Sequence, residues 1–361
     1  MYYLNVVAIG GGTGLSNLLG GLKYYLGAPE AVSNTGFGVY SLEDLTAIVS
    51  VADDGGSSGR LREEFNILPP GDIRNCMVGL ADDEKLLTRL FRYRFPGEGG
   101  LGGHNVGNLL LTALTSVTGN FLEAIRCSSE LLGIKAKILP STLAKVGLVA
   151  ELDDGTIVRG QHKITKVVRP ISRLRLDPSD CLPLKEALEA IHGADLIVIG
   201  PGSLFTSLIP NLLVKGIPEA IMRSPAKKLF VCNLLTEPGE TNGYSVEDHI
   251  ERLLAYFTKQ VFDLVVVNNW PISEATYRRC RADGMGQVWV KEPGDLYAER
   301  GVGSLVLDQG RYQVPVLYRD LVDERETVRH HRGKLASAMF EAYELLATER
   351  LDRFCCKGKF P

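Results

Sequence analysis

The sequence lacks most of the motifs by which enzymes and metalloproteins are recognised. Its seven cysteines show no C-x-x-C spacing and its six histidines show no H-E-x-x-H pattern. We therefore expect reduced thiols and no protein-bound zinc. No Gly-Lys-Ser or Gly-Lys-Thr follows a glycine-rich loop, which excludes a P-loop. No nucleophile and general base are recognisable as a pair, so the sequence assigns no catalytic residue and no metal ligand.

Long apolar runs and an excess of positive charge are also absent. No apolar stretch approaches the roughly 18 residues of a membrane span, so we expect no membrane insertion. An apolar strand begins within a few residues of the N-terminus and leaves no room for a signal peptide, which favours a cytoplasmic protein. The net charge of −3 argues against nucleic acid as a partner. With 361 residues, 45% of them hydrophobic, the chain is long enough for one large domain or two of ordinary size.

The most informative segment that is present is VADDGGSSGRLR, residues 51–62. An expected strand, 46–51, runs into glycines that let the backbone approach a ligand, and into hydroxyls and arginines that suit phosphate oxygens. Only one of the two adjacent aspartates is expected to face the ligand, to hold Mg²⁺ or a hydroxyl, because successive side chains of an extended segment alternate. A polar turn is the alternative. The candidate ligand-binding residues here are Asp53, Asp54, Gly55, Gly56, Ser57, Ser58 and Arg62.

Two further glycine-rich loops follow apolar strands, at 10–14 and at 200–207. In open parallel sheets ligands bind in the crevice outside the carboxyl ends of the strands, so these loops predict a site for a phosphorylated ligand. Packing turns are the alternative. The first loop is not a dinucleotide fingerprint, because the third glycine would fall on Leu15, which disfavours a nicotinamide dehydrogenase. The candidates are Gly10, Gly11, Gly12, Thr13, Gly14, Gly200, Pro201, Gly202, Ser203, Thr206 and Ser207.

Several single residues extend this site. Asn105 and Asn108, three apart at the start of an expected helix, share one face and suit a base, a sugar hydroxyl or a phosphate. Asn233 follows another expected strand and fits the rim of the crevice. Asp72 is interpreted as the N-cap of a helix that ends at 81. The glycine-rich segment 96–103 is a candidate lid.

The order of the expected elements predicts an α/β fold. Strands at 196–199, 229–232, 264–267 and 288–290 alternate with helical patterns, which indicates a doubly wound, mostly parallel sheet. Short alternating runs such as KAKILP and HKITKVV predict a small inserted antiparallel β subdomain. We divide the chain into 1–134 and 181–348 as two parts of the core, 135–180 as the insertion, and 349–361 as a basic tail. Further helices are expected at 84–93, 104–117, 121–132, 245–257 and 329–348.

Seven ordered segments resemble the bacterial gluconeogenesis factor family, which is similar in fold to 2-phospho-L-lactate transferase, an enzyme of deazaflavin cofactor synthesis. They are GGGTG (10–14), VADDGGSSGRLR (51–62), PPGDIRN (69–75), GHNVGNL (103–109), GPGSLFTS (200–207), CNLLTEPGETNGYS (232–245) and VVVNN (265–269). The resemblance implies a cytoplasmic, dimeric, Rossmann-like protein. It implies binding of a nucleotide-sugar such as UDP-N-acetylglucosamine, with Arg329 helping to hold it.

The resemblance also implies a biological role. Relatives are needed for cell shape and for wall (peptidoglycan) synthesis when cells grow on gluconeogenic carbon. No catalysis is established for them, so the resemblance implies action through a wall-synthesis protein partner. The alternative is a transferase that moves a phosphoryl-linked group from a nucleotide donor. No firmly bound cofactor is implied, and Mg²⁺ accompanying the nucleotide is left open. The chain departs from the family in an excursion at 27–44 and in Arg329-His330-His331-Arg332, where a later hydroxyl residue is replaced.

Overall fold

The computed structural model describes residues 2–27, 40–167, 169–291, 301–307, 310 and 312–348. Most of the expected excursion at 27–44 and the whole basic tail lie outside the described residues, so those two expectations stay predictions. None of the described helices is long and apolar enough to cross a membrane.

The centre of the molecule is an eight-stranded sheet in the order β10-β11-β9-β8-β7-β1-β2-β3. All neighbouring strands are parallel except β10 and β11. The central strands are apolar and buried along their whole length, as LIVI in β7 shows, because helices cover both faces of the sheet. The strands are β1 (Tyr2–Gly10), β2 (Tyr40–Val49), β3 (Lys137–Pro140), β7 (Leu196–Ile199), β8 (Lys227–Val231), β9 (Leu264–Asn268), β10 (Val302–Leu307) and β11 (Tyr312–Arg319).

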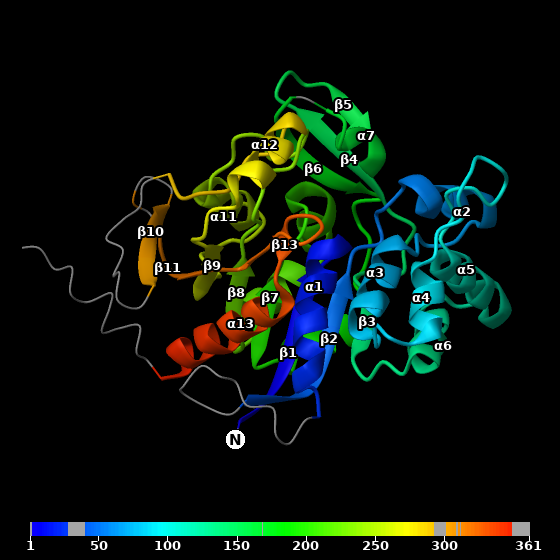
Figure 1. The fold of residues 1–361 in the computed structure, drawn as a ribbon, viewed down its shortest axis with the longest axis horizontal. Coiled ribbons are helices and arrows are strands. Elements are labelled where there is room, and N and C mark those ends of the chain that lie inside the picture. Colours follow the sequence, from blue (N-terminus) through cyan, green and yellow to red (C-terminus); the bar gives the residue numbers. More distant parts are fainter. Residues whose placement is uncertain are drawn as a thin grey trace, which may run out of the picture.

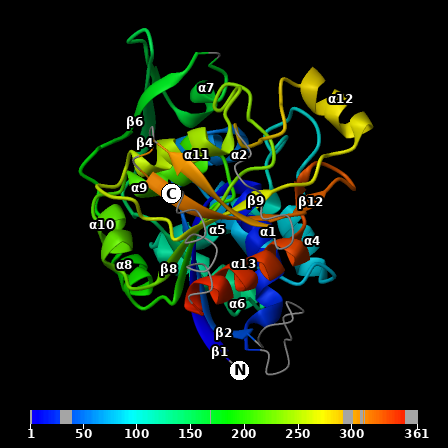
Figure 2. The same ribbon diagram turned by 90° about the vertical axis from the view of Figure 1, so that its left-hand side faces the viewer.

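Helices flank this sheet on both sides, with α1 and α13 on one face and α8 and α10 on the other (Figures 1 and 2). The expected doubly wound α/β fold is confirmed. The helices are α1 (Gly12–Leu22), α2 (Gly56–Phe65), α3 (Gly71–Leu80), α4 (Leu86–Arg92), α5 (Val106–Thr118), α6 (Phe121–Leu132), α8 (Lys185–His192), α9 (Ile209–Leu212), α10 (Ile217–Arg223), α11 (Val246–Leu254), α12 (Glu274–Ala282) and α13 (Arg332–Ala347).

A three-stranded antiparallel sheet of β4 (Gly147–Leu152), β5 (Ile157–Arg159) and β6 (Ile171–Asp177) lies beside the large one. Two segments expected in it belong elsewhere. KAKILP supplies β3, which pairs with β2 in the large sheet. HKITKVV supplies part of the short helix α7 (Gln161–Ile164) and not a strand, because Asp54 accepts hydrogen bonds from its first two backbone N–H groups.

Three further expectations, two from the C-terminal half and one from the segment between β2 and β3, are wrong. Residues 288–290 form no strand, since Val288 pairs with the loop after β8 and β11 takes the place beside β9. Arg329 lies in the two-residue strand β13 (Arg329–His330), which pairs with β12 (Val322–Asp323), and α13 begins only at Arg332. Asp72 is not a cap, because Pro70 is the N-cap of α3 and Asp72 lies within its first turn.

The contact between α1 and α3 generates a prediction. A Cβ on Gly79 of α3 would overlap the backbone carbonyl of Ser16 in α1. Gly79→Ala should therefore lower the free energy of unfolding by about 1–3 kcal/mol, although alanine in a free helix gains about 1 kcal/mol over glycine. Urea denaturation checks this. Gly333→Ala in α13 is the matched control, because its Cβ would meet only His331 at 3.5 Å; equal stability of the two variants would contradict the packing argument.

Candidate functional site

The strand order reverses between β1 and β7, and the loops that follow these two strands lie against each other. A Cβ on Gly14 would lie 2.5 Å from the carbonyl oxygen of Pro201, and one on Gly202 would lie 3.2 Å from that of Gly11. The contact is therefore between backbones and requires glycine at Gly14. A crevice at such a reversal is where open parallel sheets bind their ligands.

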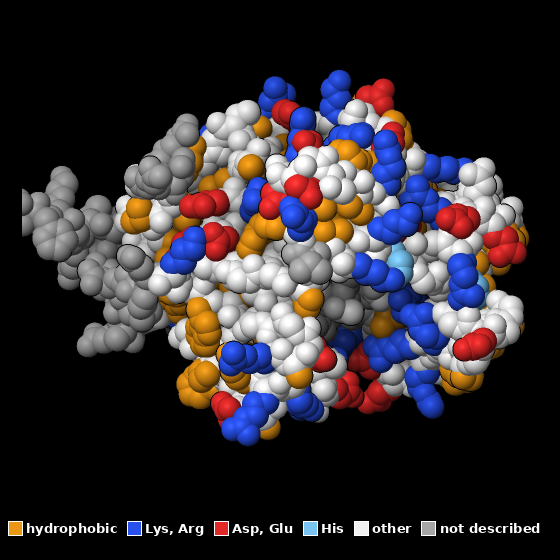
Figure 3. Space-filling model, turned by 90° about the horizontal axis from the view of Figure 1, so that it is seen from above, with side chains coloured by type: hydrophobic (Ala, Val, Ile, Leu, Met, Phe, Trp, Pro, Cys, Tyr) orange, Lys and Arg blue, Asp and Glu red, His pale blue; other side chains and the backbone are white. Residues whose placement is uncertain are grey.

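The two loops line a cavity of about 200 Å³ that also receives residues from the ends of β8 and β13. An adjoining cavity of about 660 Å³ shares Thr13, Asn17, Val328 and Arg329 with it, so together they form one crevice. The face at the carboxyl ends of the strands is hollowed near its middle, and Lys and Arg side chains gather around part of the hollow (Figure 3). The predicted site residues that line the crevice are Gly11, Gly12, Thr13, Gly14, Pro201, Gly202, Ser203, Asn233 and Arg329; Gly10 and Gly200 immediately precede them.

Arg329 lines both the narrow and the wide half of the crevice. Its Nε lies 3.5 Å from an oxygen of Asp323, and an Nη lies 3.7 Å from Glu326. Arg325 hydrogen-bonds the same Asp323, and this arginine, with burial opposing it, holds the pKa of Asp323 below its usual range. Arg92 and Arg332 line the larger half as well, and both contact Asp83. Four arginines and three carboxylates line the larger cavity, so its arginines are paired with acids and leave a small excess of positive charge for an anionic ligand.

Asn233 and Thr206 support the loop after β7. The amide of Asn233 accepts a hydrogen bond from the N–H of Gly202 at 3.0 Å and donates one to its carbonyl oxygen at 2.9 Å. Thr206 donates its hydroxyl to Glu240 at 2.8 Å, and the N–H of Phe205 also donates to this carboxylate. Burial and the neighbouring Glu237 raise the pKa of Glu240 to about 8. The N–H of Phe205 and the hydroxyl of Thr206 thus bind an internal carboxyl, and Thr206 and Ser207 lie buried beneath the crevice.

Asp53 and Asp54 face different parts of the molecule. Asp53 accepts a hydrogen bond from the N–H of Gly55 at 2.9 Å, and burial raises its pKa although Gly55 and Ser58 hydrogen-bond it. Asp54 instead accepts the N–H groups of Gln161 at 3.0 Å and His162 at 2.8 Å, which ties α7 to the large domain. Asp54 is therefore a capping residue of α7. Arg62 stands on α2, which begins at Gly56, and lines neither half of the crevice.

Asp72 is a site residue that the sequence analysis missed. A Cβ on Gly11 would lie 2.5 Å from its Oδ2, so the carboxyl packs directly beneath the first glycine loop. Burial and the nearby Asp53 raise its pKa to about 7, although Gly12 and Asn75 hydrogen-bond it. Arg74 lies near both carboxyls, and its own pKa is lowered to about 10 by burial. The sequence signal that could have identified Asp72 is the segment PPGDIRN. The same segment is also typical of an ordinary helix start, so it did not single out Asp72 as a site residue.

The expectation of no nucleophile and base pair stays a prediction, although Ser57 contacts a histidine. Its Oγ lies 3.1 Å from Nδ1 of His104, and the side-chain nitrogen of Asn108 donates to it at 3.2 Å. Asn105 is the N-cap of α5, and its side chain is occupied by Gly107 and Arg92. All four polar side chains are buried and line neither half of the crevice. The cluster joins α2 to the start of α5, and sequence spacing gave no sign of it because 47 residues separate its two main partners.

The candidate metal ligands near the glycine loops are the carboxyls of Asp53 and Asp72. Within the described ranges, no group of three or more histidine, cysteine, aspartate or glutamate side chains is arranged for a metal ion. Asp53 packs against Gly71 of α3 and Asp72 packs against Gly11, since Cβ atoms on these glycines would each lie 2.5 Å from one of the carboxyl oxygens. One or two carboxylates completed by substrate phosphates and water suit Mg²⁺. Asp53 and Asp72 match these ligands in kind, but neither lines the crevice.

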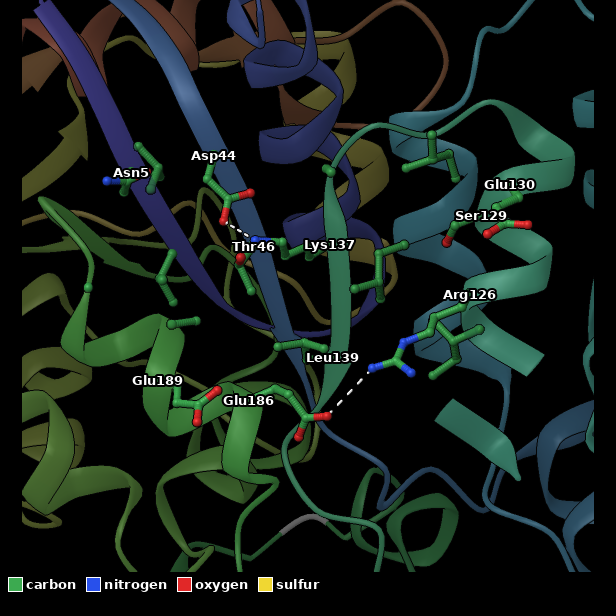
Figure 4. Close-up of a pocket in the computed structure, with 18 residues that line it drawn as sticks. Asn5, Asp44, Thr46, Arg126, Ser129, Glu130, Lys137, Leu139, Glu186 and Glu189 are labelled. Carbon is green, nitrogen blue, oxygen red and sulfur yellow. Dashed lines mark hydrogen bonds and ion pairs between the residues drawn. The ribbon is translucent and has the colours of Figure 1, made fainter. Parts of the chain in front are cut away.

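A separate cavity of about 640 Å³ opens beside β1, β2 and β3, between α6 and α8. Lys137 contacts Asp44 at 2.6 Å, and Arg126 of α6 reaches Glu186 of α8 at 3.5 Å across the opening (Figure 4). None of the site residues predicted from the sequence lines it.

The raised pKa of Asp72 predicts a pH-dependent stability. The folded protein holds this proton up to about pH 7, whereas the ordinary pKa is 3.8, so the stability contributed by this group falls as the pH rises between these values. Asp72→Asn should raise the free energy of unfolding of the ligand-free protein at pH 8 by at least ~1 kcal/mol, given about 1.4 kcal/mol per pKa unit, and change it little near pH 4. Denaturant unfolding at both pH values measures this. Asp54→Asn, which retains a capping oxygen, is the control, and a pH-independent effect of Asp72→Asn would refute the assignment.

Comparison with known proteins places this geometry in a family. The family model described as 2-phospho-L-lactate transferase CofD matches residues 6–302. The chain is 43% identical over 337 residues to the gluconeogenesis factor of Halalkalibacterium halodurans, covering 93% of this chain and 96% of that one. It is 40% identical over 336 residues to the gluconeogenesis factor of Bacillus subtilis, covering 93% and 97%.

A crystal structure of a member of the UPF0052 family from Bacillus halodurans has the same fold, with a TM-score of 0.81 and 42% identity over 94% of this chain and all of the other. These relatives each cover more than nine tenths of the chain. The chain therefore belongs to the gluconeogenesis factor family, within the broader group described by the 2-phospho-L-lactate transferase model.

Proposed function

We propose that this protein binds a nucleotide-sugar of the UDP-N-acetylglucosamine type and acts as a regulator rather than by turnover. The observation that carries the proposal is the crevice at the reversal of strand order, where two glycine loops and Arg329 come together. Family membership supports a role in gluconeogenic growth. In this proposal the protein is a cytoplasmic homodimer that supports cell shape and wall synthesis through a protein partner.

The shape and charge of the crevice support a diphosphate at its narrow part and a larger polar group beside it. The narrow half is bounded by glycine backbone, so a phosphate can approach the N–H groups at the start of α1 closely. Arg329 and three further arginines line the wide half. Planar guanidinium groups bind phosphate with two parallel hydrogen bonds, and the hydroxyl and amide of Thr13 and Asn17 suit a sugar.

A second candidate function is the transfer of a phosphoryl-linked group from a nucleotide donor. It is favoured by Asp53 and Asp72, two carboxyls beneath the first glycine loop and the start of α3 whose pKa values are raised, mainly by burial. The description of the matching family model supports it as well. Mg²⁺ bound there with the nucleotide would neutralise phosphate charge, while Asp53 and Asp72 would position it and the glycine loops would orient the donor.

The role of Arg329 can be tested directly. Arg329→Ala should weaken binding of UDP-N-acetylglucosamine by roughly 1.5–3 kcal/mol, because a charge-assisted hydrogen bond is lost. The melting temperature of the ligand-free protein should change little, since part-exposed ion pairs contribute only about 0–1 kcal/mol. Titration calorimetry and thermal denaturation measure the two effects. Arg278→Ala on the outer face of α12 is the control; intact affinity combined with a large loss of stability would make Arg329 a structural residue.

Binding without turnover has its own test. UDP-N-acetylglucosamine incubated with the protein and Mg²⁺ should be recovered chemically intact, as followed by liquid chromatography of the nucleotide. The segment 96–103, whose Gly102 accepts a hydrogen bond from Arg60 at 2.7 Å, should exchange its amide hydrogens more slowly when ligand is bound. Product in excess of the protein, abolished by Asp53→Asn or Ser57→Ala, would instead establish the transferase.

A further inference from the structure

The crevice continues past the glycine loops into a third cavity. Thr236 and Met285, which line the narrow half of the crevice, also line an open cavity of about 630 Å³. This cavity lies between the loop after β8, the C-terminal part of α12 and the chain that follows α12, so it adjoins the nucleotide-binding crevice proposed above. We call it the aromatic cavity, and it is lined by Thr236, Asn242, Gly243, Tyr244, Ser245, Tyr277, Arg281, Gly284, Met285, Gly286, Gln287, Trp289 and Val290.

The walls of this cavity carry aromatic rings that the fold leaves open. Trp289 keeps 44% of its surface exposed and Tyr277 keeps 37%, although the core of the protein buries most of its large apolar side chains. Arg281 stands one turn after Tyr277 on α12, so both side chains project from the same face of that helix. Within the described part of the chain Arg281 makes no ion pair. Open aromatic faces beside a guanidinium are the surfaces on which planar rings stack.

The backbone around these rings is held in place before any ligand arrives. The N–H of Thr236 donates to the carbonyl oxygen of Gly286 at 2.7 Å, and the N–H of Gly286 donates to the hydroxyl of Thr236 at 2.8 Å. The carbonyl oxygen of Trp289 accepts a hydrogen bond from Val246 at the start of α11 at 3.0 Å. The amide of Gln287 is occupied by the backbone of Trp270 and Ile272. The backbone that carries Trp289 is thus held in place, and the cavity combines its ring and that of Tyr277 with the guanidinium of Arg281.

We propose that the aromatic cavity is the subsite for the nucleobase of the bound nucleotide, which stacks on Trp289 and Tyr277. The proposal rests on the nucleotide-binding function proposed above and assigns the part of the ligand that the glycine loops do not contact. A diphosphate against the glycine loops places its attached nucleoside next to Thr236 and Met285, at the opening of the cavity. A nucleobase is planar and lacks charge, so stacking on aromatic rings can hold it without an ion pair.

The test compares two exposed tryptophans in calorimetric titrations with UDP-N-acetylglucosamine and with inorganic pyrophosphate, which has no base. Trp289→Ala and Tyr277→Ala should each weaken binding of UDP-N-acetylglucosamine at least tenfold and leave binding of pyrophosphate unchanged. Trp270→Ala is the matched control, because Trp270 is 58% exposed and does not line the cavity. Its affinity for both probes should equal that of the unchanged protein.

Fluorescence provides a second measurement that does not depend on which nucleotide is the natural ligand. The chain has two tryptophans, so Trp270→Phe leaves Trp289 as the sole reporter. Its emission should be quenched by UDP, GDP or ADP and not by pyrophosphate, because only a stacked base reaches the ring.

The possible outcomes separate the subsite from the proposed function. If UDP-N-acetylglucosamine binds Trp289→Ala and the unchanged protein equally, the base lies elsewhere and the nucleotide-binding function stands. If Trp289→Ala weakens pyrophosphate as much as the nucleotide-sugar, the ring has a structural role and the subsite is refuted. If UDP-N-acetylglucosamine does not bind but another nucleotide quenches Trp289, the proposed ligand fails and the base subsite stands. Quenching by a flavin analogue and by no nucleotide would assign the cavity to an acceptor ring and overturn the proposal.

Discussion

The close contact between the loops after β1 and β7 is the constraint on which the rest of the site depends. The backbone of Gly14 lies against Pro201, where no side chain fits. This contact brings the starts of α1 and of the segment after β7 to one point, although about 190 residues separate them in the sequence. Asn233 then holds the loop after β7 by hydrogen bonds to the backbone N–H and the carbonyl oxygen of Gly202. The crevice is therefore a product of backbone geometry, and its charge is supplied by side chains from later in the chain.

Two carboxyls lie beneath the loops of this crevice. Glu240 accepts the N–H of Phe205 beneath the loop after β7. Asp72 lies under the loop after β1. Both have raised pKa values, because burial disfavours their charged forms. A neutral Asp72 leaves the first glycine loop free of a repelling charge, whereas an ionised Asp72 beside Asp53 favours a cation.

Asp53 and Asp54 contact different elements, and the contact of Asp54 attaches the small sheet to the rest of the molecule. Adjacent carboxylates after β2 point to opposite sides of the chain, so Asp53 reaches toward α3 while Asp54 caps α7. The residues that follow, at the start of α2, join the segment after the candidate lid through Ser57 and His104. One short stretch of sequence therefore connects the large sheet, the small sheet and α5.

The sequence by itself determined the α/β class, the central strands and the glycine loops, because apolar runs that end in glycine have few alternative structures. It also indicated that the side chains of Asp53 and Asp54 point to opposite sides, because successive side chains alternate in any extended segment. Only the tertiary structure decided that 288–290 leaves the sheet and that KAKILP joins it, since short apolar runs do not specify their partners. Tertiary structure likewise placed Asp72 under Gly11, His104 beside Ser57, and Trp289 beside the crevice. These are contacts between side chains distant in the sequence, and their positions follow from the packing of the whole sheet rather than from any local pattern.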